Sequence, residues 1–273
     1  MSFLRKIFAA SFALLLAGPT LSAGEPLFTS FRENYLATGV PLNMKPDYDT
    51  NDLAFQASFR LNLFQNFQSD DWKIFLGYTQ FSIWDVYQPS NPFRCSIYNP
   101  GLYVDYVISK RDGLVVSDIL FGYEHKSNGL ASDASRSIDH LFFTYTRTFD
   151  KVFSLQMTGR FGVGSIGNNF SQEMFLKYQG YLNVGACLRS RDERFMLSAS
   201  ASPLFKGDIL ANVSAELAYR PTKRIDWLYL TLRYHYGYDE NQLECAVPDV
   251  KLRGMLRIGV SVQPPKLSHK LLF

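Results

Sequence analysis

The sequence has few cysteines and few charged side chains. It also has only one long apolar run, at its N-terminus. Each shortage excludes a class of protein. Cys95, Cys187 and Cys245 are too few for a disulfide framework and lack the close spacing of a metal site, so we expect them to be structural. No later apolar run reaches the roughly 20 residues of a membrane-spanning helix. A formal charge of only +3 gives no reason to expect a nucleic acid or an acidic partner.

The N-terminus has the composition of a secretory signal peptide. Arg5 and Lys6 precede a short apolar run, residues 7–16, and small residues follow up to Ala23. We expect cleavage after Ala23, which divides the chain into a leader, 1–23, and one mature domain, 24–273. The loss of Arg5 and Lys6 lowers the formal charge from +3 to +1. No cysteine follows the cleavage region, which argues against a lipoprotein anchor.

What the mature chain does have is aromatic residues in an alternating pattern. Phe, Trp and Tyr make up 15% of the sequence, yet the mean hydropathy is only −0.09. Apolar and polar residues alternate with a period of two, which is typical of strands with one apolar and one polar face. The pattern predicts twelve strands, at 28–39, 52–65, 71–84, 101–111, 114–127, 137–149, 151–163, 172–189, 192–203, 207–220, 224–237 and 251–263.

The connections between these strands alternate in length. Tight polar turns such as 111–113 and 190–192 alternate with the longer segments 85–100 and 128–136, and the chain ends on Phe273. Short turns at one end and long loops at the other are typical of an outer-membrane barrel. We therefore predict an all-β fold, a 12-stranded antiparallel transmembrane β-barrel. A soluble β-sandwich also alternates, but it requires neither twelve long strands nor a terminal aromatic residue.

His125 and Ser127 lie on the apolar face of the strand predicted at 114–127, and Asp139 lies near the start of the next strand. Alternate residues of a strand project to the same side, about 6.5–7 Å apart between Cα atoms. A histidine at that distance can take the proton of a serine hydroxyl, and an acid on the neighbouring strand can orient the imidazole. A bare His-x-Ser pattern is also common among ordinary residues at a barrel rim.

The residues around this pattern favour the catalytic interpretation. They are Tyr123-x-His125-x-Ser127-Asn128-Gly129, then Ser135-Arg136-Ser137, and upstream Tyr78-Thr79-Gln80 before Trp84 and Ser90-Asn91-Pro92-Phe93-Arg94. In this order they resemble the motifs of the outer-membrane phospholipase A family. The resemblance implies a twelve-stranded barrel that hydrolyses acyl ester bonds of phospholipids and lysophospholipids (A1/A2 type). It makes Ser127 the nucleophile and His125 the general base. Asp139 stands where that family has asparagine, so the triad would be Ser–His–Asp.

The resemblance also implies a metal ion and a second protomer. The family uses calcium (Ca2+), and the matching positions are Ser90, Leu130 and Ser135, where Leu130 offers only its backbone carbonyl. Gln80 lies on the predicted lipid face, where an amide needs a partner, and the matching glutamine of the family pairs across a homodimer interface. The resemblance implies no organic cofactor.

Other functions remain compatible with the sequence. A porin-like or adhesin-like barrel would carry the motif without using it, but its functional polar residues would point inward rather than share the apolar face. A lipid A deacylase is also a barrel with a Ser–His pair, although its family is typically smaller and the Ser-Asn-Gly continuation favours the phospholipase. A diverged pseudo-enzyme also remains compatible, because of Asp139.

Overall fold

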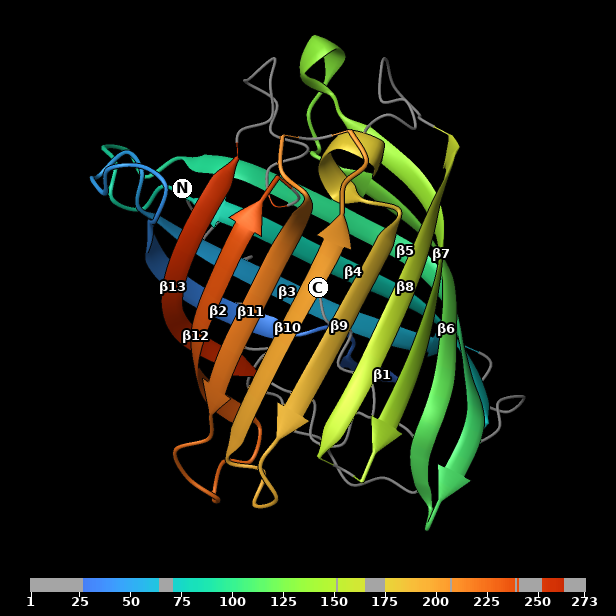
Figure 1. The fold of residues 1–273 in the computed structure, drawn as a ribbon. Helices are drawn as coiled ribbons and strands as arrows, with labels where there is room; N and C mark the ends of the chain where they lie inside the picture. Colours follow the sequence, from blue (N-terminus) through green and yellow to red (C-terminus); the bar gives the residue numbers. More distant parts are fainter. Residues whose placement is uncertain are drawn as a thin grey trace.

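The chain folds into a closed antiparallel β-barrel. The computed structural model describes residues 27–63, 71–150, 152–164, 175–206, 208–238, 240 and 252–262. From β2 onward, each strand pairs with the next along the chain, and the last strand pairs with β2 to close the ring (Figure 1). The expected leader and Phe273 lie outside the described residues. The strands are β1 (Phe28–Ser30), β2 (Asn34–Pro41), β3 (Asp52–Leu63), β4 (Trp72–Trp84), β5 (Phe93–Arg111), β6 (Leu114–Ser127), β7 (Ser137–Phe149), β8 (Phe153–Gly164), β9 (Leu182–Arg189), β10 (Phe195–Pro203), β11 (Ala211–Tyr219), β12 (Leu228–Gly237) and β13 (Arg253–Val262).

The short strand β1 does not add a thirteenth position to the barrel. It pairs with the far half of β3, where Phe28 lies opposite Leu61, while β2 pairs with the near half of the same strand, where Tyr35 lies opposite Gln56. The two segments therefore occupy one strand position, interrupted by a break that turns Phe31 into the barrel interior. The prediction of a 12-stranded antiparallel barrel is confirmed.

Two predicted strand starts were wrong by eight residues or more. We expected a loop over 85–100, but β5 begins at Phe93 and pairs with β4 through this region, including Tyr78 opposite Pro100. Asn99-Pro100-Gly101 is a turn-like sequence, but cross-strand pairing overrides this local preference. The strand expected over 172–189 begins only at Leu182, and a single π-helical turn, Phe175–Gln179, precedes it. Among the described residues, no helix is both long and apolar enough to cross a membrane.

The alternation along the strands separates an apolar exterior from a polar interior. Exposed large apolar side chains cover the outside, among them Leu102, Phe121, Phe143, Phe161, Leu197 and Leu232. Buried polar and charged side chains fill the inside, among them Asp52, Glu124, His140, Glu216, Arg233 and Arg257. This arrangement is the reverse of a soluble protein and matches a sheet whose outer face contacts lipid. Closure suits that environment, because it leaves no unpaired strand edge.

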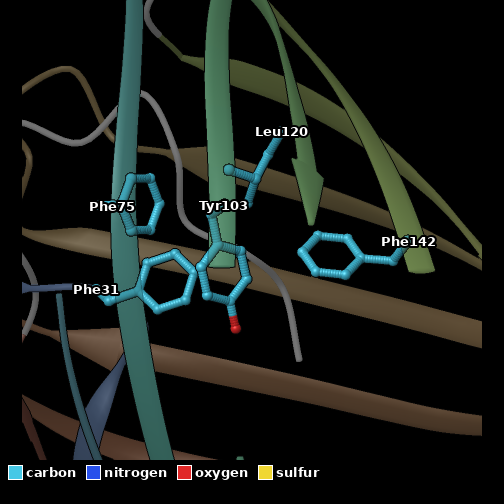
Figure 2. Packing of buried hydrophobic residues seen from close by; sticks show 5 residues of the cluster. All are labelled: Phe31, Phe75, Tyr103, Leu120 and Phe142. Atoms are coloured by element: carbon cyan, nitrogen blue, oxygen red, sulfur yellow. The ribbon is translucent and has the colours of Figure 1, made fainter. Parts of the chain in front are cut away.

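One aromatic cluster packs inside the barrel, against the inner surface of β6. Figure 2 shows the rings of Phe31, Phe75 and Tyr103 facing one another, with Phe142 on the other side of Tyr103. The centroids of Phe75 and Tyr103 are 5.1 Å apart in a stacked arrangement. A Cβ atom on Gly122 would lie 2.7 Å from the rings of both Tyr103 and Phe142, so only glycine fits at this point of β6. The cluster therefore fixes the inner side of the strand that carries His125 and Ser127.

Candidate active site on the outer face of β6 and β7

The hairpin of β6 and β7 brings the expected catalytic residues to one side of the barrel. His125 lies directly opposite Asp139, and Ser127 lies opposite Ser137, two residues nearer the connecting loop. Exposed Phe121 and Phe143 share the outward-facing positions of these strands. The site is therefore on the outer surface, at the end of the apolar band where the strands meet the β6–β7 loop.

A hydrogen bond joins two of the three expected residues. The distance from His125 Nδ1 to Asp139 Oδ1 is 2.9 Å, and the side chains are 31% and 5% exposed, respectively. Tyr123 Oη donates a second hydrogen bond to the same carboxylate oxygen, at 2.5 Å. With Nδ1 bound to the acid, the remaining ring nitrogen of His125, Nε2, is available to a serine hydroxyl.

Ser127 lies on the same face of β6 as His125, two residues further along the strand. The hydrogen bonds described for this hairpin include none between Ser127 and His125, which share a face of β6. In structures without substrate, such catalytic hydrogen bonds are often long and shorten only when substrate binds. Tyr98 lies opposite Ser127 on the other neighbouring strand, so the serine has an aromatic ring beside it.

The inner face of the same hairpin carries a buried charged cluster. Glu124 pairs directly with His140 across the hairpin, one residue along from His125 and Asp139. Its carboxylate accepts hydrogen bonds from Arg32 and from Tyr103 Oη, the latter at 2.8 Å, and His140 Nε2 lies 3.3 Å from its other oxygen. We call these four residues the Glu124 cluster. It fixes the register of the two strands directly behind the site, and sequence analysis did not identify it, because its partners are far apart in the chain.

Asn128 organises the loop that follows Ser127. Its amide nitrogen donates to the carbonyl of Ala134 at 2.8 Å, and its oxygen accepts from the backbone nitrogens of Leu130 and Arg136 at 3.2 and 3.0 Å. Gly129 has a φ of +68°, and a Cβ atom there would lie 2.6 Å from the ring of Tyr98. The Ser-Asn-Gly sequence therefore has a structural reason, in that asparagine closes the loop and glycine lets it pass the tyrosine ring.

The residues expected to bind calcium lie in two loops at the same end of the barrel. Ser90 is in the β4–β5 loop with a φ of +68°, and Leu130 and Ser135 are in the β6–β7 loop. Hydroxyl and carbonyl oxygens suit a hard cation such as calcium. The carbonyl of Ser135 already accepts a hydrogen bond from the guanidinium of Arg136 at 2.8 Å. Among the described residues there is no group of three or more His, Cys, Asp or Glu side chains that could hold a metal. The donor chemistry thus fits calcium, but the side chains of one protomer supply only part of a coordination sphere.

Gln80 lies on the outer face of β4, in the same cross-strand row as the serine. It pairs with Tyr98, which in turn pairs with Ser127. Its amide oxygen accepts from Tyr78 Oη at 3.3 Å, and its nitrogen donates to Ser82 Oγ at 3.2 Å. The amide thus has partners within its own chain. Because a glutamine amide can make up to four hydrogen bonds, part of its capacity remains.

Comparison with known proteins identifies the family. The sequence model of the family described as Phospholipase A1 matches residues 27–246. The chain belongs to the phospholipase A1 family. The match covers every described strand except β13.

Curated members of the phospholipase A1 family match part of the chain. The phospholipase A1 of Salmonella typhimurium is 29% identical over 139 residues, 49% of this chain and 46% of the relative. The phospholipase A1 of Klebsiella pneumoniae is 32% identical over 142 residues, 50% of this chain and 48% of the relative. In both cases the chain spans about half the length of the relative it matches.

Solved structures of the family have the same fold. The outer membrane phospholipase A of Escherichia coli superposes with a TM-score of 0.71 at 20% identity, covering 86% of this chain and 98% of that one. The outer membrane phospholipase of Salmonella typhi, a dimer with bound calcium, gives 0.71 at 19% identity, covering 92% and 96%. At this identity the likeness concerns the fold. Together with the family match and the apolar exterior, it makes the protein an outer-membrane β-barrel of the phospholipase A1 family.

Proposed function

We propose that this protein is a calcium-dependent outer-membrane phospholipase that cleaves acyl ester bonds of phospholipids and lysophospholipids. The hydrogen bond between His125 and Asp139, on the lipid-facing side of the hairpin that carries Ser127, is the observation that carries the proposal. A lipid substrate held in the membrane reaches such a site laterally, without entering the barrel. The names of the family and of its members agree with this activity.

The chemistry follows from the positions of the side chains. Ser127 Oγ attacks the ester carbonyl while His125 Nε2 takes its proton, and Asp139 holds the imidazolium through Nδ1–H. The imidazolium then protonates the leaving alcohol, which departs as the lysophospholipid, or as the glycerophosphodiester when the substrate is a lysophospholipid. Water, activated by the neutral imidazole, hydrolyses the acyl-serine and releases the fatty acid.

Calcium would bind at Ser90 and at the β6–β7 loop residues Leu130 and Ser135. When bound, it supplies positive charge to the oxyanion that forms during attack. Because one protomer offers few ligands, we propose that a second copy completes the site, with Gln80 in the contact between barrels. The Salmonella typhi structure is a dimer with bound calcium, which supports the involvement of both a second copy and calcium. Substitution Gln80→Ala should lower the yield of calcium-dependent cross-linked dimer, and an unchanged yield would contradict the role of Gln80.

Charged pairs inside the barrel argue against the alternative of an open porin. Arg257 of β13 bonds to Asp52 of β3 at 2.8 Å, across the position of β2. Arg233 of β12 lies 2.9 Å from Glu33, which precedes β2, and so bridges the position of β13. Such bonds between non-adjacent strands place paired side chains in the lumen, where a porin holds water.

The test is hydrolysis of phospholipid by the refolded protein in mixed micelles, with calcium and with a chelator. We expect calcium-dependent release of fatty acid that falls about a thousandfold or more in Ser127→Ala. The matched control is Ser109→Ala, whose hydroxyl bonds to Ser117 near the opposite end of the hairpins and should keep full activity. Equal, residual release by wild type and Ser127→Ala would leave a passive or pseudo-enzyme barrel and contradict the proposal.

A further inference from the structure

Tyr123 contacts Asp139, the acid of the proposed triad, on the outer surface of the barrel. It is on the outer face of β6, two residues before His125, and lies opposite Leu141 of β7. Its hydroxyl therefore reaches Asp139 diagonally across the hairpin, and donates to Oδ1 at 2.5 Å. The same oxygen lies 2.9 Å from His125 Nδ1. Two donors thus converge on one carboxylate oxygen.

This second hydrogen bond has a physical reason in the surroundings of the acid. The side chain of Asp139 is only 5% exposed, and it faces the lipid side of the sheet. A carboxylate in such a place loses most of its hydration, and this loss is costly unless other donors replace water. A phenol is well suited, because its ring tolerates the apolar surface while its hydroxyl makes a short, charge-assisted bond.

We infer that Tyr123 is a positioning residue for the proposed reaction, because it fixes the carboxylate of Asp139 so that Oδ1 faces His125. The inference rests on the proposed function. Tyr123 takes no proton from the substrate. It limits rotation of the carboxyl group and so holds the imidazole in the orientation in which Nε2 faces Ser127. A triad whose acid is locked in this way needs less reorganisation when the imidazolium forms.

The test is a double-mutant cycle on phospholipid hydrolysis and on the rate of labelling of Ser127 by a fluorophosphonate. We expect Tyr123→Phe to lower kcat and the labelling rate about tenfold, the usual scale of one charge-assisted hydrogen bond, with KM unchanged. In the Asp139→Ala background, the same change should alter kcat less than about twofold, because Tyr123 acts only through the acid. Tyr145→Phe is the matched control. It removes a hydroxyl from the outer face of β7, opposite Ile119, and should alter neither rate.

The outcomes separate this inference from the proposed function. An active wild type with Tyr123→Phe equal to Tyr145→Phe would overturn the positioning role and leave the phospholipase intact. A rise in KM, or an equal loss in the Asp139→Ala background, would make Tyr123 a substrate contact or a packing residue and also overturn it. A wild type that neither hydrolyses phospholipid nor labels at Ser127 would overturn the proposed function itself. Guanidinium unfolding midpoints within error of wild type confirm that the variants fold.

Discussion

The Glu124 cluster allows a quantitative prediction about stability. Substitution Glu124→Ala removes the carboxylate that accepts from Arg32 and Tyr103 and contacts His140, and it leaves the guanidinium of Arg32 without this partner. The side chains of Arg32 and Glu124 are only 16% and 3% exposed, so water replaces little of what is lost. Breaking a buried ion pair by removing one partner costs about 3–5 kcal/mol. We therefore expect the folded-to-unfolded ratio to fall by at least about a hundredfold.

Two further variants test the reason for this loss. Glu124→Gln keeps the shape and the bond from Tyr103 but removes the charge, and should cost about 1.5–3 kcal/mol, the scale of a hydrogen bond to a charged group. Combining Glu124→Gln with Arg32→Met removes both charges and should return stability to within about 1 kcal/mol of wild type, since removing both members of a buried pair is often nearly neutral.

The assay is equilibrium unfolding of the barrel in phospholipid bilayers with guanidinium chloride, followed by tryptophan fluorescence. Folding and unfolding curves must coincide for the free energies to be compared. A loss below about 1 kcal/mol for Glu124→Ala would refute the reasoning. So would a double variant less stable than Glu124→Gln alone, because Arg32 would then stabilise the barrel independently of Glu124.

Three other predictions use different parts of the barrel. Phe121→Arg, on the lipid face, should destabilise by about 2–4 kcal/mol in bilayer unfolding, whereas Leu210→Arg, at a loop residue 90% exposed, should change stability little. Equal losses of stability in the two variants would show that Phe121 does not face lipid. Gly129→Ala should lower hydrolysis about tenfold without preventing folding, because the new Cβ meets the ring of Tyr98 in a left-handed backbone, and full activity would contradict the close packing. Burial raises the pKa of Glu240, but the nearby arginines outweigh it and lower the pKa to about 2. The stabilisation that the Glu240 carboxylate provides is therefore complete above about pH 4.5 and is lost as the pH falls toward 2. Glu240→Gln should therefore make the free energy of unfolding depend less on pH in that range, as measured by unfolding at a series of pH values, and an unchanged dependence would contradict this role.

Much of the barrel could be predicted from the sequence, because the alternation of apolar and polar residues that indicates a strand is a local pattern. The period of two places His125 and Ser127 on one face of β6, and the structure has them on the outside as expected. The position of Asp139 near the start of the next strand predicted that it would lie near His125, and the structure places the two residues opposite each other. The roles of these residues in catalysis stay predictions, as do those of the calcium positions.

Strand ends were harder to predict, since local preferences compete there with pairing. β5 begins eight residues before the expected position, because pairing with β4 keeps residues 93–100 extended although their sequence is typical of a turn. The same limit applies to β9, where the expected strand is replaced by the π-helical turn before Leu182.

The sequence by itself determined the number of strands and which side of each faces lipid, because both follow from composition and spacing within a few residues. Only the tertiary structure decided the partners inside the barrel. Arg257 and Asp52 are 205 residues apart and meet only because the ring closes. Arg32 reaches Glu124 across 92 residues because both side chains point into the barrel interior. Tyr123 and Asp139 are close in sequence, but their contact depends on a register that the buried side of the hairpin fixes. Alternation is a local property of a strand, whereas the choice of partner depends on closure and on the packing of charges that no single segment encodes.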